Sequence, residues 1–270
     1  MTRKYKLALC QMTSSFEKEE SLQFASEFVT ESAKGGASVV SLPEMWNCPY
    51  NNKYFAKYAE PAWGRSFRLM SDLAKDNKII LIGGSIPELE GDNLYNTSFV
   101  FGPDGRLIGR HRKIHLFDVD VQGGVVFHES DTLSAGDSIT VVETEFGKIG
   151  VAICYDVRFP AMFNKMADDG AHLIVLPASF SLTTGAVHWD ILMKSRAIED
   201  QVYFAACSPA RDPDSEFKAY GHSCIVNPWG EFCAIAATEK TIVYGEIDLD
   251  YMDRVRQEIP IRRQKREDVY

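Results

Sequence analysis

The 270-residue sequence lacks any apolar stretch of about 20 residues that could cross a membrane as a helix. Its longest uncharged run, residues 170–189, is interrupted by Pro177, Gly185 and several hydroxyl side chains. Three positive charges stand within the first six residues and no small-residue cleavage site follows them, so a secretory signal is not expected. We therefore predict a cytoplasmic protein that does not act at a membrane, and a mitochondrial location stays open.

The six cysteines are scattered and form no Cys-x-x-Cys pair, which argues against a disulfide framework and favours reduced thiols. His111 and His115 are four residues apart, but the Glu of a zinc helix motif does not follow His111, and two cations separate the histidines. Structural histidines are the better interpretation, and no metal site is predicted. The glycine pairs at 83–84 and 123–124 lack phosphate-loop spacing, so no nucleotide cofactor is predicted.

Positive charge is also scarce, because 29 Lys and Arg stand against 38 Asp and Glu and give a formal net charge of −9. Binding of nucleic acid requires a clustered basic surface. The basic cluster at 262–266 is followed at once by Glu267 and Asp268. No nucleic-acid partner is therefore predicted.

Apolar residues make up 45% and aromatic residues 11% of the chain, which is typical of a globular protein with a large core. Apolar periodicity predicts strands that alternate with helices, and several hairpins. The expected strands are 5–10, 37–42, 79–82, 95–101, 106–113, 140–145, 148–154, 171–176, 201–207, 224–227, 231–236 and 241–247, and the expected helices are 19–34, 67–75, a segment near Pro160, and 190–200. This order, without a linker or repeat, predicts one α/β domain, 1–270, with two packed sheets.

Cys154 stands at a position typical of a nucleophile. It follows the apolar run 149–153 and precedes a predicted helix. The positive end of a helix dipole lowers the pKa of a thiol toward neutrality, and a strand–turn–helix connection exposes a nucleophile at the rim of a sheet. Cysteine statistics alone favour a buried core residue, so a catalytic interpretation needs chemically complementary partners.

Glu44 and Lys113 are the candidate partners, because each also follows a strand-like segment. Functional groups in α/β sheets gather beyond the carboxyl ends of the strands. A carboxylate can take the proton of a thiol, and an ammonium can stabilise the anion that forms at a carbonyl oxygen. Taken singly, Glu44 could equally be a cap or salt-bridge residue and Lys113 a solvated charge, and the sequence spacing does not establish contact.

These residues stand in motifs that resemble the nitrilase superfamily of carbon–nitrogen hydrolases, whose signature is a Glu-Lys-Cys triad. The matching stretches extend along nearly the whole chain and are 41–44, 83–88, 112–117, 150–159, 208–211, 221–223, 227–230 and 259–270. Within the superfamily the sequence most resembles the omega-amidase branch, at 113–120, 180–185 and 188–189. Two departures from the family pattern are Asp200, where many relatives carry Asn, and the loop 122–125, which bears on the substrate.

The resemblance implies a four-layer αββα sandwich, in which two mixed sheets are flanked by helices, and an enzyme that needs no cofactor. It also implies a homodimer with the C-terminal tail, about 250–270, at the subunit interface. The implied reaction is hydrolysis of the terminal amide of 2-oxoglutaramate and 2-oxosuccinamate, which yields ammonia and a dicarboxylic 2-oxo acid.

The resemblance also implies a role for each matched residue. Glu44 would be the general base and later the acid, Lys113 an oxyanion donor, and Cys154 the nucleophile that forms a thioester. The backbone N–H of Tyr155 would be the second oxyanion donor. Glu129 matches a further carboxylate near the triad, with an ordinary loop ion pair as the alternative.

A dicarboxylate-like substrate requires a local cation in a protein of charge −9. Because Lys113 is committed to the oxyanion, we predict that Arg158 binds the distal carboxylate, with a helix-start salt bridge as the alternative. Tyr50 is predicted to line the entrance, with an ordinary loop aromatic as the alternative. Two other functions stay open, namely an amidase for deaminated glutathione or an N-carbamoyl compound, and a catalytically silent binding subunit.

Overall fold

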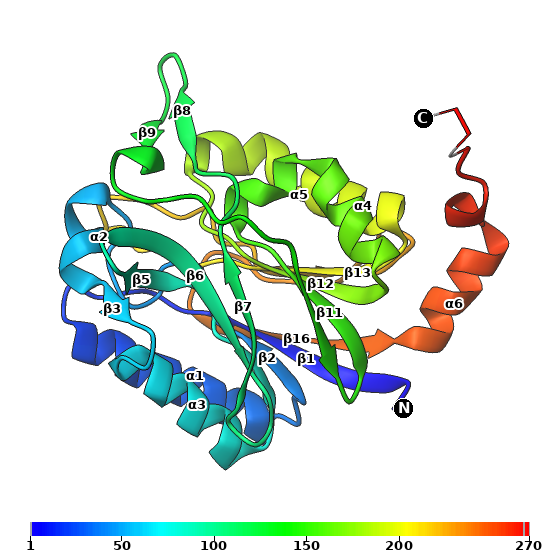
Figure 1. Cartoon of the computed structure of the whole chain (residues 1–270), viewed down its shortest axis with the longest axis horizontal. Coiled ribbons are helices and arrows are strands. Elements are labelled where there is room, and N and C mark those ends of the chain that lie inside the picture. The colour runs from blue at the N-terminus through cyan, green and yellow to red at the C-terminus, as the bar shows by residue number, and fades with distance from the viewer. Residues whose placement is uncertain (1, 267, 270) are drawn as a thin grey trace.

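The computed structural model describes residues 2–266 and 268–269. Two β-sheets pack face to face and helices cover the outer face of each sheet, so the predicted αββα sandwich is confirmed (Figure 1). Residues 267 and 270 of the predicted interface tail lie outside the described residues. Within the described ranges, no helix is both long and apolar enough to cross a membrane.

The first sheet is built around β1 (Lys4–Gln11), which pairs in parallel with β2 and antiparallel with β16. Its strand order is β16-β1-β2-β4-β6-β5-β3, and β7 pairs with β6. The bounds of the other strands are β2 (Val39–Ser41), β3 (Glu60–Pro61), β4 (Ile80–Ile82), β5 (Ile86–Glu90), β6 (Asn93–Phe101), β7 (Leu107–Arg112) and β16 (Thr241–Asp248). The parallel strands β1, β2 and β4 bring their carboxyl ends to one edge of the sheet.

The second sheet has the order β10-β11-β12-β13-β14-β15, with β11, β12 and β13 parallel. Its strands are β10 (Thr140–Thr144), β11 (Gly147–Val151), β12 (Ala171–Pro177), β13 (Tyr203–Cys207), β14 (Cys224–Val226) and β15 (Phe232–Ile235). A separate hairpin, β8 (Asp118–Asp120) and β9 (Val126–His128), protrudes from the sandwich (Figure 1).

Helices α1 (Lys18–Lys34) and α3 (Arg65–Asn77) cover the first sheet, and α4 (Pro160–Asp168) and α5 (Leu182–Asp200) cover the second (Figure 1). Helices α1, α3 and α4 each present an apolar stripe to their sheet, as amphipathic helices do. The other helical segments are α2 (Asn52–Tyr58), α6 (Leu249–Glu258) and the 3₁₀ turns η1 (Glu129–Asp131), η2 (Cys154–Arg158) and η3 (Ile261–Arg263).

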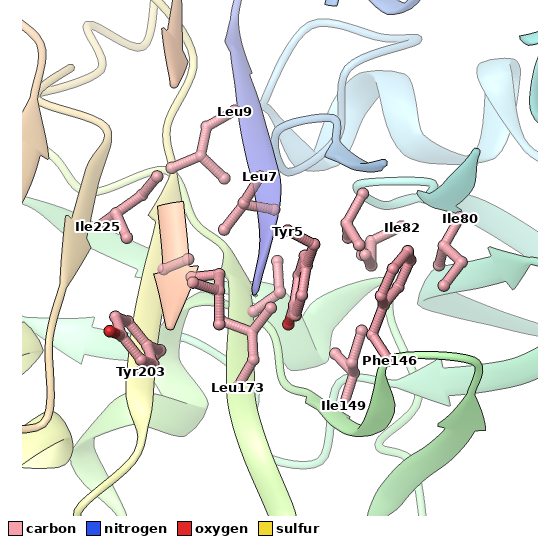
Figure 2. Close-up of a cluster of buried hydrophobic side chains, with 14 of the residues drawn as sticks. Tyr5, Leu7, Leu9, Ile80, Ile82, Phe146, Ile149, Leu173, Tyr203 and Ile225 are labelled. Atoms are coloured by element: carbon pink, nitrogen blue, oxygen red, sulfur yellow. The ribbon is translucent and has the colours of Figure 1, made fainter. Parts of the chain in front are cut away.

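A cluster of buried apolar side chains fills the space between the two sheets (Figure 2). Leu7 and Leu9 of β1 belong to it, together with Ile80 and Ile82 of β4. The second sheet contributes Ile149, Leu173, Tyr203 and Ile225, among others. Burial of apolar surface contributes about 25 cal/mol of stabilising free energy per Å², and here both sheets bury their inner faces against each other. The strand ends that carry functional groups are therefore held on a rigid frame.

The predicted hairpins are confirmed as β6–β7, β10–β11 and β14–β15. The helix predicted to begin at residue 190 begins instead at Leu182, where Ser181 caps it by accepting a hydrogen bond from the Thr184 N–H at 3.4 Å. Its first turns contain threonine and glycine, which are weak helix formers, so the sequence pattern does not indicate a helix before residue 190. The elements α2, α6, β5 and β8–β9 are not among the predicted ones, because they are short or depend on contacts with distant segments.

Candidate active site

Glu44, Lys113 and Cys154 meet in one buried site, although they are far apart in the sequence. Glu44 comes after β2, Lys113 comes after β7, and Cys154 comes after β11. The Nζ atom of Lys113 lies 3.0 Å from Oε1 of Glu44, and the Glu44 carboxyl interacts with the Cys154 thiol. The structure thus brings together the three residues that the sequence singled out.

Three donors hold the Glu44 carboxylate. Its Oε1 accepts hydrogen bonds from Lys113 Nζ and from Nδ2 of Asn96, the latter at 2.9 Å. Its Oε2 accepts one from the backbone N–H of Ser179 at 2.7 Å. Burial raises the pKa of Glu44 above its ordinary value, although the charge of Lys113 opposes this shift. A carboxyl with a raised pKa is suited to take and return a proton near neutral pH.

The turn that carries Glu44 is held by the segment after β4. The Ser85 N–H donates to the carbonyl oxygen of Pro43 at 3.1 Å. Gly84 has a φ of +59°, and a Cβ atom there would lie 2.2 Å from the same oxygen. A side chain at this position would collide with the turn, which explains why a glycine stands at position 84 of the Gly-Gly-Ser sequence at 83–85.

Lys113 is completely buried and contacts two carboxylates. Its Nζ donates to Oε1 of Glu44 at 3.0 Å and lies 2.8 Å from Oε2 of Glu129. Burial alone would lower the pKa of Lys113, but the charges of Glu129 and Glu44 outweigh burial and raise it. The ammonium therefore stays charged, as a donor to an oxyanion must.

Glu129 is completely buried in η1 and is not an exposed loop ion pair. Its Oε1 accepts hydrogen bonds from Lys113 at 3.0 Å and from the Tyr50 hydroxyl at 2.7 Å. Its Oε2 accepts one from the Phe117 N–H at 2.7 Å. Glu129 therefore restrains the ammonium with a carboxylate that is itself held at both oxygens.

Tyr50 makes a contact that the sequence did not indicate. Its ring lines a small hollow beside Glu44, but the side chain is buried and its hydroxyl is engaged by Glu129. The reason is that a buried carboxylate needs several donors, and Tyr50 supplies one of them. Tyr50 thus restrains Glu129, and its place at the substrate entrance stays a prediction.

Cys154 lies on a sharp turn. It opens the five-residue 3₁₀ turn η2 with a φ of +47°, in the left-handed region that non-glycine residues rarely adopt. Helix α4 begins only at Pro160, after this turn. The geometry corresponds to a strained strand-to-helix connection that directs a nucleophile out of a sheet.

The prediction that a helix dipole lowers the pKa of Cys154 is wrong. Burial, followed by the negative charge of Glu44, raises the pKa of this thiol well above its ordinary value, and Lys113 opposes the shift only in part. The five-residue turn is too short to supply a strong dipole. A thiol with a raised pKa needs a nearby base to act as a nucleophile, and the carboxyl of Glu44 is the group beside it.

A small hollow opens beside Cys154. It is lined by Phe117, Cys154, Tyr155, Arg158, Ser179, Phe180 and Thr184. The backbone N–H of Tyr155 donates to no other described residue and is available to an oxyanion. A larger hollow of about 690 Å³ lies elsewhere, between α1 and β16, and shares none of these residues.

Arg158 faces the hollow that contains Cys154. Within residues 2–266 and 268–269, no carboxylate forms a salt bridge with Arg158, so the alternative of a helix-start ion pair is not found. Its Nη2 atom lies 3.3 Å from Nδ1 of His188, and its guanidinium lies 5.4 Å from the centre of the Phe180 ring. The cation therefore has no carboxylate partner among the described residues and lines the same hollow as Cys154.

Sequence reasoning missed two groups that hold Glu44. Asn96 stands in an Asn-Thr-Ser triplet that resembles a glycosylation site, yet it is completely buried in β6 and donates to Glu44. A run of three polar residues inside an apolar strand was the available signal. The other group is the backbone N–H of Ser179, which no side-chain pattern could reveal.

The histidines suggested by the sequence to be structural, His111 and His115, both contact Asp156. In the described part of the chain, no cluster of three or more His, Cys, Asp or Glu side chains has a geometry that could hold a metal ion.

Comparisons with known proteins place these observations in a family. The carbon–nitrogen hydrolase family profile matches residues 6–257. The omega-amidase NIT2 of Xenopus tropicalis is 50% identical over 267 residues, which are 99% of this chain and 97% of that protein. Human omega-amidase NIT2 is 50% identical over 266 residues, which are 98% and 96% of the two chains.

Solved structures agree with this assignment. The crystal structure of Saccharomyces cerevisiae Nit3, a member of branch 10 of the nitrilase superfamily, has a TM-score of 0.91 and 42% identity and covers 98% of both chains. The C. elegans NitFhit protein has a TM-score of 0.91 at 31% identity, and the match covers 100% of this chain and 66% of that one. Together with the buried Glu, Lys and Cys, these similarities show that the chain belongs to the carbon–nitrogen hydrolase family of the nitrilase superfamily and is a hydrolase of carbon–nitrogen bonds.

Proposed function

We propose that this protein is an omega-amidase that hydrolyses the terminal amide of 2-oxoglutaramate or 2-oxosuccinamate to ammonia and the 2-oxo dicarboxylic acid. The observation that carries the proposal is the buried cluster of Glu44, Lys113 and Cys154, in which a base, a cation and a sulfur nucleophile share one site. The 50% identity to proteins named omega-amidase NIT2, along nearly the full length, supports the substrate class.

In the first half of the proposed reaction, Glu44 takes the thiol proton and the sulfur of Cys154 attacks the carbonyl carbon of the amide. Negative charge develops on the carbonyl oxygen, where the Lys113 ammonium and the Tyr155 N–H stabilise it. Glu44 then returns the proton to the departing nitrogen. Ammonia leaves, and an acyl thioester remains on Cys154.

In the second half, a water molecule attacks the thioester and Glu44 takes a proton from it. The tetrahedral oxyanion forms again at the same two donors. Collapse of this intermediate breaks the carbon–sulfur bond, the acid leaves, and the proton returns to the Cys154 sulfur. Glu44 thus acts alternately as base and acid, which its raised pKa favours.

The purified protein should release ammonia from 2-oxoglutaramate with a kcat/KM at least about 100-fold above that for glutamine or an aliphatic nitrile. A site built to bind the groups of one substrate rejects analogues that leave those groups unpaired. The measurement is ammonia release across a substrate panel that includes deaminated glutathione and an N-carbamoyl amino acid. A preference for either of these would replace the omega-amidase proposal, and no turnover of any substrate would favour a binding subunit.

Arg158 is our proposal for the group that binds the distal carboxylate. It lines the hollow that contains Cys154, it has no ion-pair partner among the described residues, and it is only partly buried. A guanidinium recognises a carboxylate with two parallel hydrogen bonds. In a protein of charge −9, such a local cation is needed for an anionic substrate to bind.

Substitution of Arg158 by glutamine should raise the KM for 2-oxoglutaramate about 10- to 100-fold, because a hydrogen bond to a charged group contributes about 1.5–3 kcal/mol. The expected effect on kcat is smaller, because the distal carboxylate takes no part in bond breaking. The KM of Arg158→Lys, which keeps the charge, should lie between the KM of the parent and that of Arg158→Gln. Steady-state kinetics with 2-oxoglutaramate and with an uncharged aliphatic amide check this, and an unchanged KM for the former would remove Arg158 from the site.

We further propose a homodimer in which the C-terminal tail, about 250–270, lies at the subunit interface. The outer face of α5 exposes Val187 and Ile191, at 57% and 65% of their full surface, together with Ile198. Trp229 is also exposed. A set of large apolar side chains on one helix face is typical of a surface covered by a partner. We also propose that residues 1–270 form a single catalytic domain and that the protein is cytoplasmic.

A further inference from the structure

Asp156, two residues after the nucleophile, is completely buried and accepts hydrogen bonds at both carboxylate oxygens. Oδ1 accepts from the backbone N–H of His115 at 2.9 Å and from its ring Nδ1 at 2.8 Å. Oδ2 accepts from the N–H of Ile153 at 3.0 Å and from Nε2 of His111 at 3.1 Å. Four donors on one carboxylate leave it little freedom to move.

The donors come from two segments of the chain. Ile153 belongs to the turn that carries Cys154, and the two histidines stand two residues before and two residues after Lys113. Asp156 therefore connects the nucleophile turn to the segment that carries the buried ammonium. These are the two parts whose separation decides whether sulfur and cation can act on the same carbonyl group.

The carboxylate is ionised, as this arrangement requires. Burial alone would raise the pKa of Asp156, but the hydrogen bonds from His111 and His115 outweigh burial and hold its pKa well below the ordinary value. The ring of His115 is also restrained, because it stacks on Phe159 with ring centres 3.6 Å apart. Only His115 of the two histidines reaches the surface, since 27% of its side chain is exposed and His111 is fully buried.

We propose that Asp156, bound by His111 and His115, is a positioning group that holds the Cys154 turn and the Lys113 segment at the separation required for catalysis. This inference rests on the proposed amidase reaction, in which sulfur and ammonium act on one carbonyl. It assigns a function to a carboxylate and two histidines that take no part in the chemical steps. The left-handed backbone at Cys154 is a conformation that needs such external support.

Removal of Asp156 could unfold the turn, so the test uses His115. Asparagine places its amide nitrogen where the Nδ1 atom of histidine lies, and glutamine places it where Nε2 lies. Because His115 uses Nδ1 to bind Asp156, His115→Asn should keep the hydrogen bond, and His115→Gln and His115→Ala should lose it. Phe159→Leu is the matched control, since it removes the ring stacking and leaves the hydrogen bond in place.

We expect kcat for 2-oxoglutaramate to fall about 10- to 100-fold in His115→Ala and His115→Gln, with KM within about threefold, because small displacements of reacting groups are costly. His115→Asn and Phe159→Leu should stay within about threefold of the parent. The rate of Cys154 alkylation by iodoacetamide should likewise fall in His115→Ala and His115→Gln and stay near the parent rate in His115→Asn and Phe159→Leu. Alkylation needs no substrate, so this measurement keeps its meaning if the protein proves not to be an omega-amidase.

Two results would overturn the inference. One is an equal loss of kcat in all three His115 variants, because the hydrogen bond to Asp156 would then not be the cause. The other is a lower melting temperature in His115→Ala with unchanged kcat and alkylation rate, which is the behaviour of a merely structural contact.

Discussion

Replacement of Cys154 by alanine is expected to abolish ammonia release from 2-oxoglutaramate, to below about one ten-thousandth of the parent kcat, and to leave the protein folded. The loss follows because no other described group at the site can form the thioester, and removal of a nucleophile costs several orders of magnitude. The fold should persist because alanine keeps the Cβ atom, and the strained turn is held by Asp156 and not by the sulfur. Ammonia release and a thermal melting curve measure the two effects.

Cys224→Ala is the matched control, because Cys224 is also completely buried but lies on β14, outside the site. It should lose some stability and keep its turnover. Turnover in Cys154→Ala at the parent rate would end the proposed mechanism.

The raised pKa of Glu44 also predicts how the activity of the parent enzyme depends on pH. Glu44 acts as a base only when ionised, so kcat/KM should fall as the pH decreases, with a midpoint above the ordinary value of 4.5.

Replacement of Lys113 by methionine is expected to cost both activity and stability. Loss of one oxyanion donor typically lowers kcat about 100- to 1,000-fold. The structure adds a second effect, because the Lys113 ammonium compensates two buried carboxylates, Glu44 and Glu129. Removal of one partner from a buried ion pair costs about 3–5 kcal/mol of unfolding free energy. Steady-state kinetics and chemical denaturation should therefore both show large changes.

The double variant Lys113→Met with Glu129→Gln separates the two effects. Neutral glutamine removes one of the carboxylates that Lys113 compensated, so part of the lost stability should return. Activity should not return, because the oxyanion donor is still missing. Recovery of kcat in the double variant would show that Lys113 serves only to neutralise Glu129, and the oxyanion role would have to be abandoned.

Prediction from the sequence succeeded where a residue type and a local pattern carry the information. Glu44, Lys113 and Cys154 could be singled out because each follows a strand and each has chemistry that complements the others. Glu129 could not be separated from an ordinary ion pair, since its burial depends on η1 folding over Lys113 and Tyr50. The pKa of Cys154 was predicted in the wrong direction, because a helix dipole is a local property and the burial of the thiol is not.

The sequence by itself determined the order of the main strands and helices, the α/β class and the three side chains that meet in the candidate site, because periodicity and strand–turn–helix connections are properties of short stretches of chain. Only the tertiary structure decided which protonation states those side chains adopt and what holds them in place. Asn96 on Glu44, Glu129 on Lys113 and Asp156 beneath Cys154 come from different segments, and each acts through hydrogen bonds formed in a buried environment. Charges interact strongly there because water is excluded, and that exclusion exists only once the two sheets have packed.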